Sequence, residues 1–187
     1  MLAICFTSCK KGPNDPAFSL RSRKARLTGN WSLVSGSKIE VEPNPSIKIV
    51  MEEYYDEESC DRISTQGSAR ITDFIAFNKK MNFADNGSFV FTTTYKDRLI
   101  IERGTWSFAG KMDGKKNKEQ IIVTLEEVET TVTYNNTIAS AILHPNTRIR
   151  YAIKELRNKS MEIYGSYTYT DKWGYKGSIS EEYKLGQ

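Results

Sequence analysis

The stretch KMNFADNGSFVFTTTY, residues 80–95, decides the fold class of this 187-residue chain. At its centre Asn86-Gly87 stands between alternating apolar residues, and this setting predicts a β-hairpin because a type I′ turn needs two residues with positive φ. Alternate residues of a strand point to the same side, so Phe89, Phe91 and Tyr95 share one face. The stretch therefore predicts two antiparallel strands that turn an aromatic face toward a core.

Similar short segments, separated by turn signals, continue on both sides of this hairpin. Further strands are predicted over residues 27–34, 47–55, 71–77, 99–108, 121–125, 148–154, 161–169 and 175–185. The polar and acidic residues from 52 to 68 predict that the second strand runs out into a long loop. The Ala/Ile-rich stretch 137–143 predicts one helical turn before Pro145.

About nine strands with mostly hairpin-length connections pair with their sequence neighbours. A sheet of this size tends to curl and close, because closure removes its exposed edges. We therefore expect an all-β fold, an up-and-down antiparallel β-barrel of about eight or nine strands. A β-sandwich is the alternative architecture.

The composition supports a β-rich domain and indicates no transmembrane helix. Hydrophobic residues make up 39% of the chain, and its ten Tyr, eight Phe and three Trp suit a half-buried pleated surface. No apolar run reaches the roughly 18 residues that a transmembrane helix needs.

The formal net charge of +4 does not belong to the predicted domain. Residues 10–26 hold six basic side chains and one acidic one, which leaves 21 basic and 22 acidic side chains for residues 27–187. A nucleic-acid-binding domain more often carries its basic face on the folded part itself. We therefore expect no nucleic-acid partner.

The sequence offers little for a metal site or for catalysis. The three cysteines, Cys5, Cys9 and Cys60, lack the spacing of zinc ligands, and His144 is the single histidine. No Gly-x-Ser-x-Gly motif and no Cys/His pairing indicate a nucleophile. We expect no enzyme, no catalytic residues, no metal site and no cofactor, although a carboxylate pair among the 23 acidic residues stays open.

The N-terminal residues Phe6-Thr7-Ser8-Cys9 resemble a bacterial lipobox, in which an apolar residue and two small ones precede a cysteine that receives a diacylglycerol. The resemblance implies that residues 1–8 are the last part of a signal peptide that starts upstream of Met1, and that Cys9 carries a lipid anchor. Residues 9–26 are polar and contain two prolines, as a flexible tether does. The alternative is an ordinary N-terminus in which Cys9 stands by chance.

The basic stretch Arg21–Arg26 ends this tether. Each basic residue near an anionic bilayer adds about 1 kcal/mol of attraction, so the stretch would hold the tether close to the membrane. The alternative is a short helical lead-in that lies across the mouth of the barrel.

Two Gly-x-Trp motifs extend the pattern: Gly29-Asn30-Trp31 heads the first strand, and Gly104-Thr105-Trp106 lies mid-chain. Later, the strand Tyr151–Leu156 leads to Met161-Glu162-Ile163. With the lipobox and the tether, this order is similar to the lipocalin-like domains of bacterial envelope lipoproteins, over residues 27–187.

That resemblance implies a barrel whose first tryptophan, Trp31, plugs the closed end. It also implies a lipid-anchored protein of the bacterial cell envelope, which we place at the outer membrane. Vertebrate-type lipocalins stack a late arginine on the first tryptophan, and Arg148 and Arg150 are the candidates here.

The fold leaves two functions to weigh. A barrel of about eight strands holds one small ligand if its inward side chains are small, and is otherwise filled. We expect a small hydrophobic ligand, whose candidate contacts are Trp31, Phe89, Phe91, Trp106, Tyr151 and Ile153. Each of these is alternatively an ordinary core residue, since aromatics dominate cores.

The second function is docking of another envelope protein without a ligand. Its candidate contact is the acidic stretch 52–61, which is alternatively a solvated loop without the spacing of a calcium site.

Overall fold

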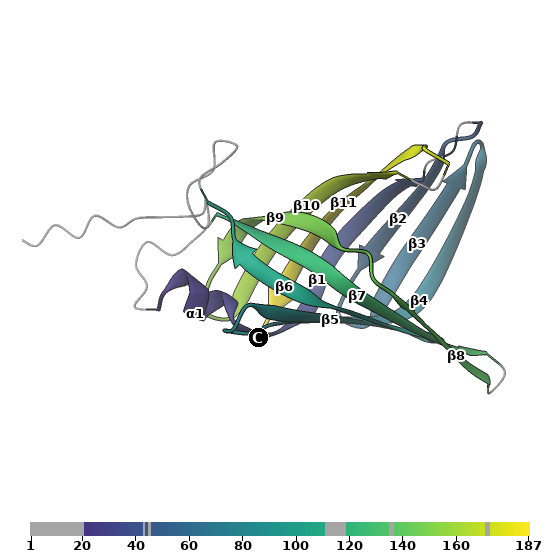
Figure 1. Cartoon of the computed structure of the whole chain (residues 1–187). Helices are drawn as coiled ribbons and strands as arrows, with labels where there is room; N and C mark the ends of the chain where they lie inside the picture. The colour runs from purple at the N-terminus through teal and green to yellow at the C-terminus, as the bar shows by residue number, and fades with distance from the viewer. Residues whose placement is uncertain (1–20, 43, 45, 111–118, 135–136, 171–172) are drawn as a thin grey trace, which may run out of the picture.

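The structure, a computed structural model, describes residues 21–42, 44, 46–110, 119–134, 137–170 and 173–187. In this part of the chain ten antiparallel strands form a closed barrel, and an eleventh strand extends its wall (Figure 1). The elements are α1 (Arg23–Leu27), β1 (Gly29–Glu42), β2 (Ile49–Tyr55), β3 (Ser59–Gln66), β4 (Ala69–Phe83), β5 (Ser88–Tyr95), β6 (Arg98–Phe108), β7 (Gln120–Tyr134), β8 (Thr137–Leu143), β9 (Thr147–Leu156), β10 (Ser160–Thr170) and β11 (Lys176–Gly186). The sheet runs β6-β5-β4-β3-β2-β1-β11-β10-β9-β7-β8, and a β6–β7 pairing closes the ring. The predicted all-β antiparallel barrel is confirmed.

The barrel is narrower at one end because the β2–β3 hairpin does not reach it. At this narrow end β1 pairs directly with β4, from Gly29 opposite Phe83 to Ser32 opposite Lys80. From Gly36 onward β1 pairs instead with β2, while the earlier part of β4 pairs with β3. Over the described residues, eight strands therefore surround the narrow end and ten surround the wide end. Eight strands enclose an interior that side chains can just fill, and additional strands widen it.

A tryptophan and α1 close the narrow end. Trp31 is 1% exposed, and its indole Nε1 donates a hydrogen bond of 2.8 Å to the carbonyl oxygen of Leu27, which is fully buried. The guanidinium of Arg26 donates to the carbonyl oxygen of Leu156 at the end of β9, which fixes α1 to the barrel. Each large apolar side chain buried here contributes about 1.5–3 kcal/mol. The last residues of the predicted tether, 23–26, thus belong to a packed helix.

The prediction of a long loop over residues 52–68 is wrong, because most of this stretch forms the β2–β3 hairpin. Asp56 makes its turn: the carboxylate accepts hydrogen bonds from the backbone N–H groups of Glu58 and Ser59, at 2.9 and 2.6 Å. The inward face of β2 carries Glu53 beside Tyr55, so the strand lacks the apolar alternation by which half-buried strands are recognised.

The helical turn predicted over residues 137–143 is also wrong, since these residues form β8 and pair with β7 along their whole length. β7 changes partner along its course: Gln120–Leu125 pair with β9, and Val128–Tyr134 pair with β8. β8 is last in the sheet order, so its outer edge has no strand partner within the described residues. Figure 1 shows this β7–β8 arm, residues 128–134 and 137–143, projecting from the barrel wall. With the hairpin and the arm, the described strands number eleven rather than the predicted eight or nine.

The only helix among the described residues is α1, and no helix there is long and apolar enough to span a membrane.

Both glycines of the Gly-x-Trp motifs are required by the backbone. Gly29 has a φ of +135°, a conformation that residues with a side chain rarely adopt. The β6–β7 register shifts between Arg103 and Gly104, where Glu126 of β7 is the extra residue, and a β-carbon on Gly104 would overlap the carbonyl oxygen of Thr124. In the second motif, Gly104 therefore allows β6 and β7 to approach closely beside the buried Trp106.

We expect Gly104→Ala to lower the free energy of unfolding by about 1–3 kcal/mol, the usual cost of forcing extra atoms into a packed site. Urea unfolding followed by circular dichroism measures the change. Gly110→Ala is the matched control, because a β-carbon there meets open space. Equal stability of the two variants would contradict the close approach.

Candidate functional site

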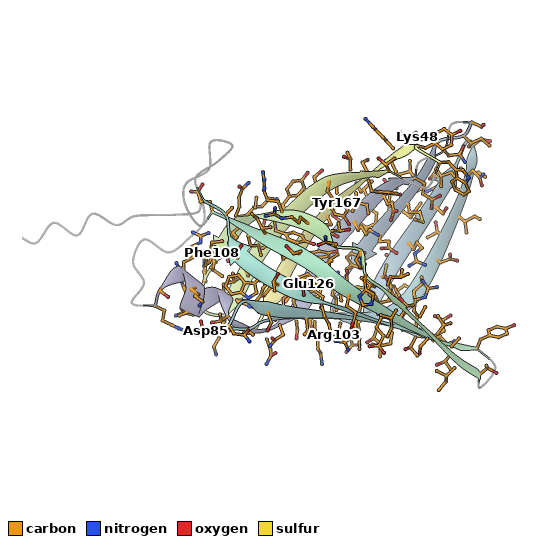
Figure 2. The ribbon with its side chains drawn as sticks, viewed as in Figure 1. Lys48, Asp85, Arg103, Phe108, Glu126 and Tyr167 are labelled. Atoms are coloured by element: carbon orange, nitrogen blue, oxygen red, sulfur yellow. The ribbon has the colours of Figure 1, made fainter. Side chains whose placement is uncertain are left out.

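A cavity of about 160 Å³ lies inside the barrel beyond the packed narrow end. Sixteen residues line it, of which seven are aromatic and five are charged. The charged ones are Lys38, Glu53, Lys79, Glu102 and Glu181. Figure 2 gives the orientation: Asp85 lies beside α1 at the narrow end, Lys48 lies at the wide end, and Tyr167, which lines the cavity, lies between them.

Charges of alternating sign form one row across the wall. In the strand registers Arg62 of β3 lies opposite Glu53 of β2, Glu53 opposite Lys38 of β1, and Lys38 opposite Glu181 of β11. Residues directly opposite in antiparallel strands share a face, so all four side chains turn inward. Opposite charges in such pairs stabilise the sheet.

Glu53 is the most strongly held carboxylate of this row. Tyr55 Oη donates to Glu53 Oε2 at 2.6 Å, and Arg62 Nε and Nη2 lie 2.7 and 2.6 Å from Oε1. Burial opposes the charge of Glu53, but these hydrogen bonds, with the charges of Arg62 and Lys38, outweigh it and hold its pKa below the ordinary value. Glu53 is therefore a fixed negative charge near neutral pH.

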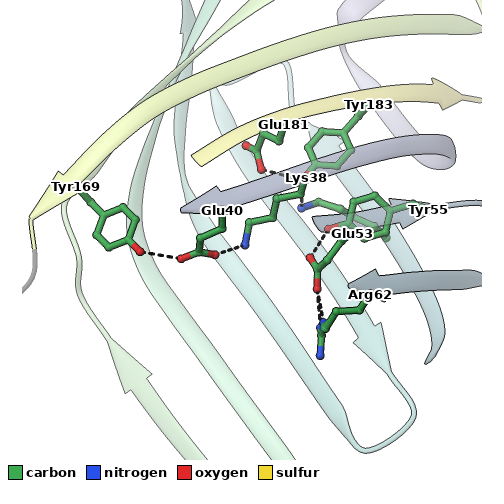
Figure 3. A network of polar contacts seen from close by, with 9 residues as sticks. Lys38, Glu40, Glu53, Tyr55, Arg62, Tyr169, Glu181 and Tyr183 are labelled. Atoms are coloured by element: carbon green, nitrogen blue, oxygen red, sulfur yellow. Dashed lines mark hydrogen bonds and ion pairs between the residues drawn. The ribbon is translucent and has the colours of Figure 1, made fainter. Parts of the chain in front are cut away.

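Lys38 extends the network toward the wide end (Figure 3). Its Nζ lies 2.9 Å from Glu40 Oε2, and Tyr169 Oη donates to Glu40 Oε1 at 2.9 Å. Burial works against the ammonium charge, but the hydrogen bond with Glu40 and the charges of Glu40, Glu53 and Glu181 raise the pKa of Lys38. Lys38 therefore stays charged and neutralises carboxylates on both sides.

Two tyrosines hold Glu181, the carboxylate of β11. Tyr183 Oη donates to Oε2 at 2.8 Å, and Tyr151 Oη donates to Oε1. The Tyr151 ring can lie over β10 and reach Glu181 because residue 165, its neighbour on β10, is glycine; a β-carbon there would lie 2.7 Å from the ring. Burial, together with the neighbouring carboxylate, raises the pKa of both tyrosines well above the ordinary value, so both hydroxyls stay protonated donors.

Lys79 and Glu102 complete the charged lining. Neither forms an ion pair with a described residue, and neither has a pair of hydrogen-bond partners such as the two tyrosines that hold Glu181. Lys79 Nζ lies over the ring of Tyr183, 4.7 Å from its centroid, and 3.4 Å from its hydroxyl oxygen. Glu102, on β6, accepts no hydrogen bond from the described part of the chain. Burial raises its pKa; the charges of Lys79 and Lys38 act against this rise and that of Glu181 adds to it.

The six residues expected to contact a ligand divide into two groups. Phe91 and Tyr151 line the cavity. The other four are buried in the continuous core and do not line it: Trp31, Phe89, Trp106 and Ile153. The position of these four residues is that of ordinary core residues, which was the alternative interpretation.

The charged lining was missed by sequence reasoning, although a signal for it exists. Lys38 and Glu40 alternate within β1, as Glu53 and Tyr55 do within β2 and Glu181 and Tyr183 within β11. Alternation of charged or tyrosyl residues inside a predicted barrel strand is a signature of a polar interior, and a search for apolar alternation passes over it.

The remaining candidates lie away from the cavity. Arg148 and Arg150 are exposed, so neither stacks on the buried Trp31, and that expectation is wrong. His144 is exposed, with Nδ1 3.2 Å from the backbone oxygen of Glu126. Cys60 is a fully buried thiol whose pKa burial raises to about 12, which makes it unreactive.

Cys9 and the signal stretch 1–8 lie outside the described residues. Among the residues that are described, no three His, Cys, Asp or Glu side chains gather as a metal site.

Comparisons of the chain with protein-family models, with curated proteins and with solved structures find no match in any of the three. The lipocalin-like resemblance therefore stays a prediction that rests on the sequence pattern.

Glu102→Gln tests whether Glu102 is a half-buried charge without a partner. Because its pKa is raised in the folded chain, the folded state binds this proton more tightly than the unfolded state does. The resulting stabilisation is complete below about pH 4 and is lost as the pH rises through the raised pKa. We expect the variant to have a higher Tm than the wild type at about pH 8 and the same Tm at about pH 4.

Thermal unfolding followed by circular dichroism measures both values. Glu126→Gln, at an exposed position of β7, is the control and leaves the Tm unchanged at either pH. A lower Tm for Glu102→Gln at the higher pH would mean that the carboxylate has a stabilising partner.

Proposed function

We propose that this chain is a lipid-anchored protein of the bacterial envelope that binds one small polar molecule inside its barrel and catalyses no reaction. The observation that carries the proposal is the charged cavity. Burying ion pairs is often no more stabilising than apolar packing of the same volume, and can be less so. The narrow end of the same barrel is filled with apolar side chains, so the chain has the means to fill its interior. A charged cavity beside such a core supports binding over a purely structural barrel.

The lining favours a polar ligand over the hydrophobic one that the sequence suggested. Five charged side chains and the hydroxyls of Tyr55, Tyr95, Tyr151, Tyr167 and Tyr183 border a space of about 160 Å³. A wholly apolar ligand there would desolvate these groups and return no hydrogen bonds, which costs roughly 1–3 kcal/mol for each group left unsatisfied. The volume is close to that of an engineered cavity of about 150 Å³ that holds benzene, so the ligand has few non-hydrogen atoms.

The anchor gives this binding protein an orientation. Cys9 and α1 are separated by 13 residues, which reach at most about 45 Å when extended. α1 packs at the narrow end, so a lipid on Cys9 would hold that end toward the bilayer. The wide end would then face away from the membrane, which we take to be the outer membrane.

Native mass spectrometry of protein purified from the envelope of its own host tests both parts of this function. We expect a small adduct on the native protein that denaturation releases, and a diacylglycerol on Cys9 that it does not. Thr93→Phe, which fills the cavity from β5, should lose the adduct, whereas Thr94→Phe on the exposed face of the same strand should keep it. A clean mass for the wild type argues against the ligand, and an unmodified Cys9 argues against the anchor.

A second candidate function, docking of an envelope protein, is favoured by the β7–β8 arm rather than by the acidic stretch. β8, with the sequence TIASAIL, has no charge and no proline, and all its residues are exposed. Tyr134, Ile138, Ile142 and Leu143 are each more than half exposed. Proteins usually protect an edge strand with charges or proline, and an unprotected edge can accept a strand of another chain.

Lysine substitutions at Ile138 and Ile142 test this docking, because charge on an edge strand opposes strand addition. We expect the double variant to lose the products that photo-cross-linking at β8 gives with envelope proteins in living cells. Ile39→Lys, on an exposed position of the paired strand β1, is the control and should keep them. Cross-linking that the lysines do not change would exclude the edge as the docking surface.

A further inference from the structure

We propose that the ligand of the interior cavity is a small zwitterion, with its carboxylate on Lys79 and its ammonium group on Glu102. The inference rests on the proposed binding function and names the chemical class of the ligand. It follows from two charges that line the same small cavity and that the protein leaves without ionic partners.

The other interior charges already have partners within the protein. Arg62 is paired with Glu53, and Lys38 with Glu40. Glu181 accepts hydrogen bonds from two tyrosine hydroxyls. Each charged group of the wall made by β1, β2, β3 and β11 therefore already has a partner within the protein, so this wall offers a ligand fewer open groups than Lys79 and Glu102 do.

Lys79 presents its ammonium group to the cavity. Its contacts within the described chain are the face of Tyr183, the ring of Phe91 at 5.9 Å and the Tyr183 hydroxyl at 3.4 Å. An ammonium group has three donors, and these contacts leave it without a carboxylate. A ligand carboxylate would supply the charge-assisted hydrogen bonds that it lacks.

Glu102 presents the complementary group from β6. Its register partners are Phe91 on β5 and Val128 on β7, and neither side chain can donate a hydrogen bond. A ligand ammonium would supply donors for the carboxylate. The aromatic rings of the lining add to this preference, because ring faces attract organic cations.

The strands keep the two charges apart. Lys79 lies opposite Thr93, and Thr93 lies opposite Ile100, so two strand spacings of about 4.8 Å separate Lys79 from β6. Glu102 is two residues further along β6 than Ile100, which adds about 7 Å. The side chains face one cavity without forming an ion pair, and a molecule with both charges can contact each of them.

Binding should release protons if Glu102 meets an ammonium group. The charged and titratable groups that face it are Lys79 from β4, Lys38 from β1, Glu181 from β11, Tyr151 from β9 and Tyr167 from β10. In the empty cavity, burial favours the protonated carboxyl. A bound cation favours the carboxylate, so ligand binding displaces a proton.

Titration calorimetry with matched probes tests the inference: α-aminobutyrate and γ-aminobutyrate, butylammonium, butyrate, and butanol. We expect an aminobutyrate to bind and the three singly charged or neutral probes to bind at least about tenfold more weakly. Tighter binding of butylammonium, butyrate or butanol would overturn the zwitterion while leaving the cavity as a ligand site. No binding of any probe would count against both the zwitterion and the proposed binding function.

Two variants separate recognition from folding. Glu102→Gln and Lys79→Gln should each weaken aminobutyrate binding by about tenfold or more. Glu126→Gln and Lys80→Gln change exposed residues and serve as matched controls with wild-type affinity. Titrations over a series from about pH 5 to about pH 8, in buffers of different ionisation enthalpy, should show proton release for the wild type where Glu102 titrates and none for Glu102→Gln. Unchanged affinity of a folded Glu102→Gln variant would overturn the assignment.

Discussion

The interior of this barrel depends on one constraint, the pairing of β1 with two different partners. β1 pairs directly with β4 at the narrow end, and further along the β2–β3 hairpin separates them. The hairpin changes a ring of eight described strands into one of ten. Strand number sets barrel diameter, so the same insertion accounts for a packed core at one end and a cavity beyond it.

The hairpin also brings much of the charge that borders this cavity. Glu53, Tyr55 and Arg62 all lie on β2 and β3, and the register puts Glu53 opposite Lys38. Removing one member of such a buried set would leave an uncompensated charge, which costs several kcal/mol, whereas the complete set is close to neutral in its effect on stability. The stability of the barrel must therefore come mainly from the apolar narrow end, where Trp31, Phe83 and Leu27 are fully or almost fully buried.

The sequence predicted those parts of the fold whose signals are local and apolar. The Asn86-Gly87 turn and the alternating aromatics after it form the β4–β5 hairpin, with Phe83 opposite Phe89. The type I′ turn expected there is wrong, because Gly87 has a positive φ and Asn86 does not. The first tryptophan motif does lead to a buried Trp31 beside α1. The β2–β3 hairpin was missed because its inward face is charged, and β8 was missed because its exposure follows from a change of partner on β7 that no local pattern encodes.

For the candidate site, the sequence predicted a barrel interior but few of the residues that line the cavity. Of the six expected contacts only Phe91 and Tyr151 reach the cavity, because the others fall on the part of each strand that lies at the narrow end. Which part of a strand faces a packed core and which part faces a cavity is set by pairings such as β1 with β4, between residues about 50 positions apart. A pattern within a single strand gives the face of a side chain but not its height along the barrel.

The two walls of the cavity differ in how their charges are compensated, and this difference follows from the register. On β1, β2, β3 and β11 every charged side chain has a partner close by: Arg62 pairs with Glu53 across one strand spacing of about 4.8 Å, and Lys38 pairs with Glu40 on its own strand. Two tyrosine hydroxyls hold Glu181. On β4 to β6 the charges of Lys79 and Glu102 are separated by the apolar or small side chains of β5. The first wall is held rigid by its own ion pairs and tyrosine hydrogen bonds, and so presents a fixed shape. The second wall keeps two charges available for a ligand. A binding site needs a fixed shape, which reduces the entropy lost on binding, and it needs unpaired charges, which make binding selective.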